Sequence, residues 1–454
     1  MNLHARVRNF AEKKRMDTGF RAILQGSIMM NKVIVGSVAL FITLFASTAG
    51  AQQKKDRLTV GGYGEVALSR NFYSDNVYRY SSASAHKGES HGRFDIPHAV
   101  IYLGYDFGKG WSMQTEIEFE HLGTGTEVEK EFEEAGEWES EVERGGEVEL
   151  EQFWIQKSFM PQINVRMGHL VVPVGGLNNR HEPLNFFTVY RPEGEYTVLP
   201  STWHDTGISI WGQAGTWRYE AMLISGLDAM LFSRDNFIKN GAHTPFPFQV
   251  SNHPGVAGRI DKSFAFGLDL GLSGYYSDAF NNTFPYEEVN NSYISGATGS
   301  TVIGAFDFRY MGKNLIVRGN ADYGHISDAK AISKYKSAKG AASGSPYSDT
   351  PIGDEAFSAG IEAGYDIFSL IPVKDKEQKF YVFGRYEYYN PYIANNSQGS
   401  YPFTEKHRIA AGINWIPIPN IAVKAEYSHR FLKTGYNDEP SISIGVAYMG
   451  FFKH

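Results

Sequence analysis

The sequence of 454 residues has no cysteine, so a disulfide framework is excluded and stability must come from a large hydrogen-bonded sheet. Strong charge of one sign is also missing: 43 Lys and Arg stand against 50 Asp and Glu, for a formal net charge of -7. Without a basic arm or patch, we expect no nucleic-acid partner. No nucleophile elbow, phosphate-cradling loop or Cys/His metal-ligand spacing occurs. We therefore expect no catalysed reaction, no cofactor and no metal site.

Long hydrophobic runs are scarce as well. Val33–Ala46 (VIVGSVALFITLFA) is apolar but shorter than the roughly 20 residues that a membrane-spanning helix needs. A lysine precedes it, and the small-x-small pattern of a signal-peptide cleavage site follows at Ala49-Gly50-Ala51. We predict that residues 1–51 are an N-terminal extension and signal peptide that is removed. The basic segment before the apolar run is long for a signal peptide. Translation from Met29 or Met30 would explain it, and an N-terminal membrane anchor is the alternative.

Short alternating runs of apolar and polar residues are abundant, together with 48 Gly, 27 Tyr and 31 Phe. In Trp111–Leu122 the apolar set includes Ile117 and Phe119, and the polar set includes Glu116 and Glu118. Because successive strand residues point to opposite faces, such a strand has one apolar and one wet face. The pattern predicts about sixteen strands, in the size range of porins: Leu58–Asn71, Phe94–Tyr105, Trp111–Leu122, Val148–Lys157, Val165–Val172, Thr206–Gln213, Trp217–Ser225, Gly255–Asp261, Ala265–Ser277, Thr301–Met311, Leu315–Ile326, Ala356–Leu370, Lys379–Asn390, Lys406–Trp415, Ile421–Leu432 and Ser441–Phe452.

Alternation alone does not separate a membrane barrel from a soluble sandwich, but the loop lengths do. Short turns such as Met160-Pro161-Gln162 and Met311–Asn314 alternate with long loops along the whole chain. Outer-membrane barrels have this one-sided arrangement, with short periplasmic turns and long external loops. The sequence therefore predicts an all-β protein, in which residues 52–454 form a transmembrane antiparallel β-barrel. Export by the signal peptide would place it in the outer membrane of a Gram-negative bacterium, with the lipid of that membrane as a partner.

One connection has neither a helical nor a strand period and is dense in aromatics, prolines and paired charges. Loops of this length are more often functional than incidental. We predict that residues 173–205 fold into the barrel as a pore-constricting loop. The alternative is that its polar residues only tie the loop to the wall; both roles are compatible. The candidates for the constriction are Asn178, Asn179, Arg180, His181, Glu182, Arg191, Glu193, Glu195, His204 and Asp205.

Strand parity places charges of both signs on the lumen face. The basic residues form a track over Arg166, Arg309, Arg318, Arg385, Arg408, Lys424 and Arg430, and an acidic side consists of Glu116, Glu118 and Glu120. Since Arg and Lys bind phosphate, the track is a candidate path for anions. The alternative is that these charges pair across neighbouring strands and solvate a water-filled lumen.

Residues 123–146 form an acidic external loop. Runs of like charge are usually solvated. The functional alternative is divalent-cation binding that links the loop to anionic lipid or to a neighbouring subunit.

Several motifs resemble the phosphate-selective porin O and P family, especially its Bacteroidetes-type members. They are Gly61–Glu65 (GGYGE), Glu147–Gln156 (EVELEQFWIQ), His181–Asn185 (HEPLN), Tyr190–Glu195 (YRPEGE) and Pro200–Gly207 (PSTWHDTG). The resemblance covers nearly the whole mature chain. It implies a sixteen-stranded channel, often a homotrimer, that is selective for phosphate.

These observations predict an outer-membrane porin for passive diffusion of small hydrophilic solutes or ions, with inorganic anions such as phosphate as candidates. A second hypothesis is a structural or interaction subunit whose lumen is plugged and whose external loops bind a partner. A third, a hydrolase built on a barrel, has no motif in its support.

Overall fold

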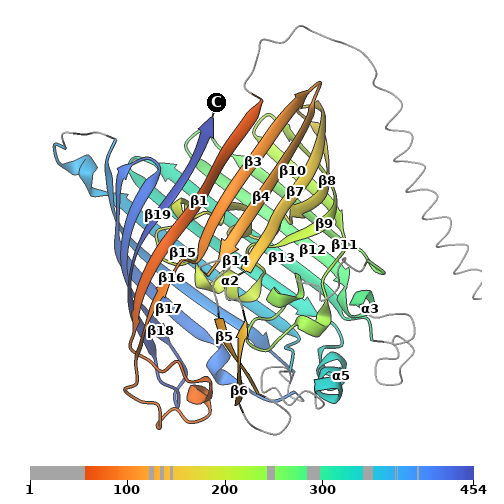
Figure 1. Ribbon diagram of the computed structural model, residues 1–454, viewed down its shortest axis with the longest axis vertical. Helices are drawn as coiled ribbons and strands as arrows, with labels where there is room; N and C mark the ends of the chain where they lie inside the picture. Colours follow the sequence, from red (N-terminus) through yellow and green to blue (C-terminus); the bar gives the residue numbers. More distant parts are fainter. Residues whose placement is uncertain are drawn as a thin grey trace, which may run out of the picture. The chain divides into compact units, whose positions relative to one another are not determined.

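The computed structural model describes residues 57–453 except for 122–126, 133–137, 144–146, 243–250, 284–296, 341–350, 374, 376 and 396–397. The predicted export segment, residues 1–51, lies outside the described residues. All described residues belong to one compact unit. That unit is a closed antiparallel β-barrel (Figure 1).

The barrel closes because its first and last strands pair. β1 pairs with β19 over thirteen registered positions, from Thr59 to Asn71, and with β2 and β3 on its other side. β9 pairs with β10, so no open edge is left in the main sheet. The sheet has seventeen strand segments. β2 and β3 are two parts of one strand, interrupted where Pro97 lacks the N–H that a ladder bond requires. The barrel therefore has sixteen strands, as the alternation predicts.

The strands of the main sheet are β1 (Leu58–Asn71), β2 (His91–Asp95), β3 (His98–Gly108), β4 (Trp111–Glu120), β7 (Glu147–Met160), β8 (Ile163–Val171), β9 (His204–Ala214), β10 (Trp217–Ile224), β11 (Gly255–Ser263), β12 (Leu268–Asp278), β13 (Ser300–Gly312), β14 (Leu315–Ile326), β15 (Glu355–Asp366), β16 (Lys379–Ile393), β17 (Lys406–Ile418), β18 (Ile421–Phe431) and β19 (Glu439–Lys453). The helices outside the loop between β8 and β9 are η1 (Val77–Tyr80), η4 (Ala229–Leu231), η5 (Lys239–Ala242), α3 (Ala279–Thr283), α5 (Ala329–Gly340), η6 (Ile367–Leu370) and η7 (Pro402–Thr404). Of the helices in the described ranges, none combines the length and apolar character needed to cross a membrane.

The turns explain both the register and one shift from prediction. Between β13 and β14 a two-residue turn has positive φ at Lys313 (51°) and Asn314 (63°), as hairpins that match strand twist require. β12 begins at Leu268 instead of Ala265, because Phe264 N–H donates to the Leu268 carbonyl and Gly267, at φ 94°, completes the turn. The long loops, with α3 and α5, lie at the barrel end opposite to the C-terminal end of β19 (Figure 1).

The acidic external loop contains a hairpin that the sequence analysis does not predict. β5 (Glu127–Phe132) pairs with β6 (Trp138–Glu143) as a separate two-stranded sheet. The register places Glu opposite Glu at three positions. A valine pair lies between two of these positions, and an aromatic pair, Phe132 with Trp138, follows the last of them. This period of two favours a strand, and the count of glutamates conceals it.

The strands expose apolar side chains on the outside, and the buried inner face carries polar and charged side chains beside one apolar cluster. On β12, Leu272 is 59% exposed, whereas its neighbour Ser273 is 7% exposed. On β15, Ile361 is 49% exposed and Glu362 only 1%. A soluble fold buries its apolar faces, whereas a lipid-facing barrel exposes them and keeps charge in the lumen. The outer face therefore suits a hydrocarbon environment.

Candidate functional site

The connection between β8 and β9, residues 172–203, enters the barrel; we name it the inward loop. It contains η2 (Asn178–Arg180), η3 (Pro183–Asn185) and α2 (Glu193–Val198). Figure 1 draws α2 within the ring of strands, and hydrogen bonds to β15, β16 and β18 hold the loop there. All of its residues are buried or half-buried. The predicted inward loop is thus present, and it packs tightly against the wall.

Lys424 on β18 is the central anchor of the loop. Its ammonium donates to three backbone carbonyls of the loop, those of Pro183 (2.5 Å), Phe186 (2.9 Å) and Thr188 (2.9 Å). The side chain is buried, and the Phe186 ring lies 4.3 Å from the nitrogen. An ammonium has three N–H donors, so this arrangement uses all of them.

Carboxylates of the wall accept the loop's backbone N–H groups. The N–H of Phe187 donates to Glu362 (3.2 Å), that of Val189 to Glu426 (3.0 Å) and that of Gly194 to Glu387 (2.8 Å). Backbone groups cut off from water need such partners. The buried glutamates of β15, β16 and β18 therefore position irregular backbone inside the barrel.

Glu193, at the start of α2, joins the loop to two wall arginines. It accepts from Arg430 Nε at 2.7 Å and lies 3.3 Å from Arg408 Nε. The Tyr389 hydroxyl also donates to it, at 2.7 Å. Burial raises the pKa of Glu193, but the charges of Arg430, Arg408 and Lys406 outweigh burial and lower it. Glu193 is therefore ionised at neutral pH.

Asn178 closes the base of the loop. Its amide donates to the carbonyls of Val172 (2.7 Å) and Trp203 (3.1 Å), and its carbonyl oxygen accepts from the Trp203 N–H (2.5 Å). Asn179 donates to the Gly175 carbonyl at 2.7 Å. These bonds fix where the chain leaves and rejoins the barrel wall.

Beside the loop, against β13 to β16, lies a cavity of about 510 Å³ of empty space, open solvent included. Gly176 allows the close approach here, since a Cβ on it would lie 2.7 Å from the Asp307 Cβ. We name this space the arginine cavity, after the four arginines in its lining. Its charged lining residues are Arg180, Arg309, Arg318, Arg385, Glu195, Asp307 and Glu362.

Two of the three carboxyl groups that line the arginine cavity have cationic partners. Asp307 accepts from Arg259 at 3.0 Å. Glu362 accepts from Arg318 at 2.9 Å and lies 3.8 Å from Arg385.

Two arginines of the arginine cavity have no close carboxylate partner among the described residues. Arg180 is 3.8 Å from Asp269, with both side chains partly exposed. Within the described part of the chain, no carboxylate oxygen lies within 4.0 Å of the Arg309 guanidinium. Its register partners are Asp269 on β12 and another cation, Arg318, on β14. The cavity is therefore an electropositive site.

Glu195 adds little negative charge to this cavity. It is 2% exposed, and its carboxylate accepts from the Leu177 N–H at 2.8 Å. Burial, followed by the charges of Asp322 and Asp307, raises its pKa well above the usual value. A carboxyl in that position holds its proton to a higher pH than a solvated glutamate does.

The ten residues predicted for the constriction occupy different places. Arg180 and Glu195 line the arginine cavity. Asn178, Asn179 and Glu193 make the loop contacts described above, and Glu182 accepts from Asn185 within the loop. The remaining four are buried or half-buried away from the cavity lining: His181, Arg191, His204 and Asp205.

The predicted basic track divides as well. Arg309, Arg318 and Arg385 line the cavity, whereas the last three members of the track hold the loop. Arg166 lies between two tryptophan rings, 5.2 Å from Trp154 and 5.0 Å from Trp211.

The predicted track omits Arg259. The sequence contains a signal for a lumen-facing Arg259, because this residue alternates with the apolar Ile260 in a predicted strand. In the structure Ile260 is 44% exposed.

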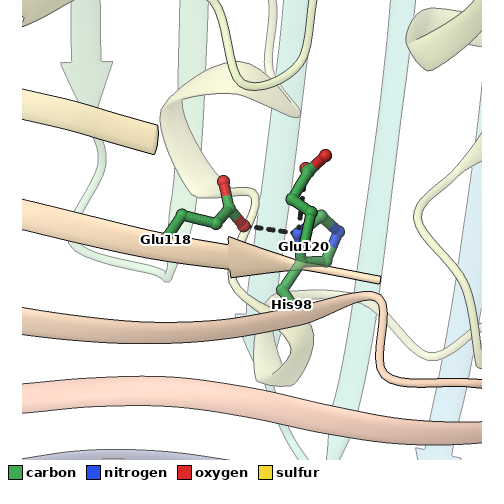
Figure 2. A group of neighbouring side chains, drawn as sticks. All are labelled: His98, Glu118 and Glu120. Carbon is green, nitrogen blue, oxygen red and sulfur yellow. Dashed lines mark hydrogen bonds and ion pairs between the residues drawn. The ribbon is translucent and has the colours of Figure 1, made fainter. Parts of the chain in front are cut away.

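The acidic side on β4 faces histidine as well as the loop. His98 Nδ1 hydrogen-bonds to Glu118 and lies 3.4 Å from Glu120, the residue opposite it in the β3–β4 register (Figure 2). Glu118 also lies 4.0 Å from the Arg191 guanidinium of the inward loop. The wall of β3 and β4 therefore carries its own polar cluster, against the loop.

Comparison with known proteins supports the fold. No protein-family model matches the chain. An uncharacterized protein of Aquifex aeolicus is 28% identical over 399 residues, which cover 86% of this chain and 79% of that protein. Among solved structures, an anion-selective porin from Comamonas acidovorans covers 87% of the chain and 100% of its own, with a TM-score of 0.50 and 10% identity. OmpF of Salmonella typhi, in complex with daunomycin, covers 87% of the chain and 98% of its own, with a TM-score of 0.52 and 12% identity. At these identities the likeness concerns the fold.

Proposed function

We propose that the chain is an outer-membrane channel through which small hydrophilic solutes diffuse, with a preference for small anions such as inorganic phosphate. The observation that carries this proposal is the arginine cavity between the inward loop and the wall. There Arg309 has no carboxylate oxygen within 4.0 Å among the described residues, and Arg180 has only a distant acidic partner. A narrow, electropositive passage lowers the energy of an anion more than that of a cation.

The setting of the cavity supports an outer-membrane channel. The barrel has an apolar exterior and a charged interior, which is the division that a membrane channel needs. Its fold is that of outer-membrane porins, one of which is described as anion-selective. Membership of the phosphate-selective porin O and P family, assembly as a homotrimer and export by the predicted signal peptide are parts of the same proposal.

Single-channel recording of the purified protein in a planar bilayer tests this function. We expect stepwise conductance. Under a potassium chloride gradient, the reversal potential should lie closer to the equilibrium potential of chloride than to that of potassium. Inorganic phosphate should reduce the chloride current, because arginines bind phosphate more strongly than chloride. A cation preference would contradict the anion part of the proposal and leave the channel part standing.

A second candidate function is a plugged barrel that acts as an interaction subunit. One observation favours it: every residue of the inward loop is buried or half-buried. The same recordings distinguish the two functions. A correctly folded barrel that shows no steps above the bilayer background would support the plugged subunit and exclude the channel.

The raised pKa of Glu195 predicts a pH-dependent selectivity. The carboxyl is protonated below its raised pKa, and it ionises as the pH rises through that value. Ionised Glu195 adds a negative charge to the arginine cavity, so the preference for anions should decrease as the pH rises. Reversal potentials measured from neutral to alkaline pH check this. Glu195→Gln, which keeps an acceptor for the Leu177 N–H, should remove the pH dependence in this range; an unchanged dependence would assign it to another group.

A further inference from the structure

Outside the arginine cavity, three ligand-bearing side chains converge at the contact between the inward loop and the wall. They are Glu116 of β4, Glu151 of β7 and His181 of the loop. One ligand atom from each lies within 4.8 Å of the other two. The residues are 0%, 1% and 5% exposed, so water does not solvate them.

In each of the two carboxylates, one oxygen accepts a hydrogen bond and the other accepts none from the described residues. Gln152 donates its amide to Glu116 Oε2, and Thr202 donates its hydroxyl to Glu151 Oε1. The remaining oxygens, Oε1 of Glu116 and Oε2 of Glu151, are buried and have no hydrogen-bond partner among the described residues.

His181 shows the same division. Its Nδ1 lies 2.9 Å from the Asn178 carbonyl oxygen, which can only accept, so Nδ1 carries the proton. Nε2 then holds a lone pair, and it too is buried without a partner among the residues described. Histidines that bind metals are typically oriented in this way, by an N–H bond from the other ring nitrogen.

Three buried acceptors facing one another repel unless something positive or a proton joins them. Two basic groups lie nearby. His204 Nε2 lies 3.4 Å from Glu151 Oε1, the oxygen that Thr202 already holds. The Arg191 guanidinium of the loop donates to the Ser201 carbonyl and approaches Glu118, at 4.0 Å, instead of this group. Tyr63 adds another buried hydroxyl that has no hydrogen-bond partner among the residues described, with its ring 5.9 Å from that of His181. The polar groups here are thus arranged for a ligand that accepts electron pairs.

We propose that Glu116, Glu151 and His181 bind a divalent cation of the first transition row. One imidazole nitrogen with two carboxylate oxygens suits Zn²⁺ or Mn²⁺, whereas Ca²⁺ and Mg²⁺ prefer oxygen ligands only. The cation joins the inward loop to β4 and β7, on a side where Lys424 does not reach. The sequence predicts no metal site, because the three ligands come from separate segments and match no metal-binding motif.

The neighbouring group of His98, Glu118 and Glu120 is different. Its histidine Nδ1 already bonds to Glu118 and lies 3.4 Å from Glu120, as Figure 2 shows, so this ring nitrogen has carboxylate partners. Of these three residues, only Glu118 has a buried side-chain atom, Oε2, without a hydrogen-bond partner among the described residues. We assign the cation to the first group alone.

The test is the metal content of the full-length protein purified in detergent. After removal of metal with a chelator, reloading with Zn²⁺ or Mn²⁺ and gel filtration, the wild type should retain about one equivalent. Glu151→Gln and His181→Gln should retain less than about a tenth of that amount. His253→Gln, which changes a half-exposed histidine elsewhere, is the matched control and should bind like the wild type.

The outcomes separate a metal from a shared proton. If the folded wild type retains neither ion, or if both ligand variants bind as it does, the proposal fails. It also fails if Glu116→Gln melts at a higher temperature than the metal-free wild type and Zn²⁺ does not change the melting temperature of the wild type. In that case shared protons, and not a metal, connect the carboxyl groups. Where a variant does not fold, Co²⁺ absorption of the wild type decides: bands that saturate at one equivalent support the site, and their absence overturns it. None of these readouts depends on conductance.

Discussion

Lys424→Met is expected to release the inward loop and to lower the free energy of unfolding by about 3 kcal/mol. The ammonium of Lys424 serves three loop carbonyls, and methionine fills similar space without a donor. Carbonyls left unpaired inside the barrel lose more than the hydrogen bond itself, because water does not replace the donor. Glu426 of the same strand would also lose a nearby positive charge. Urea unfolding followed by tryptophan fluorescence measures the change.

Lys433→Met is the matched control for this substitution. Lys433 pairs with Glu405 at 2.5 Å, but its side chain is 53% exposed. Exposed pairs are worth about 0–1 kcal/mol, so the control should unfold nearly as the wild type does. In bilayers Lys424→Met should show a noisier and larger conductance, because a loosened loop no longer fixes the width of the lumen. A variant with wild-type stability and steady current would show that the wall carboxylates alone hold the loop.

The fold could be predicted almost completely because the barrel is built from a local rule. Alternation with period two and the difference between turns and loops are both visible in the sequence, and β1 and β14 have the bounds predicted for them. The differences arise where another signal competes. Pro97 interrupts a strand, and glutamates hide the strand period of β5 and β6.

The site could be predicted only in part, because parity gives the direction of a side chain but not its partner. Arg309 and Lys424 belong to the same predicted track. Arg309 lies at the cavity without an ion-pair partner among the described residues, whereas Lys424 is buried beneath three carbonyls of a loop more than 230 residues earlier in the chain. Glu116 and His181 likewise come together only through the folding of the inward loop. Contacts between distant segments follow from tertiary structure, and no local pattern in the sequence records them.

If the arginine cavity is the passage, a charge change at Arg309 should alter selectivity without breaking the barrel. We expect Arg309→Glu to shift the anion-to-cation permeability ratio about a hundredfold toward cations. A change of two charges at about 6 Å in a water-like medium raises the energy of an anion by about 1.4 kcal/mol and lowers that of a cation by as much, which is a factor of about ten for each ion. Because no carboxylate pairs with Arg309 among the described residues, the substitution breaks no ion pair there.

Reversal potentials under a salt gradient measure this shift, and Lys262→Glu provides the comparison. It makes the same change of charge at the end of β11, where Lys262 bonds to Thr216 near a short turn and away from the cavity lining. If both variants shift the ratio equally, the selectivity comes from the net charge of the barrel and not from the cavity. If only Arg309→Glu shifts it, ions pass the guanidinium closely. The unpaired arginine beside the inward loop then determines which ions the channel admits.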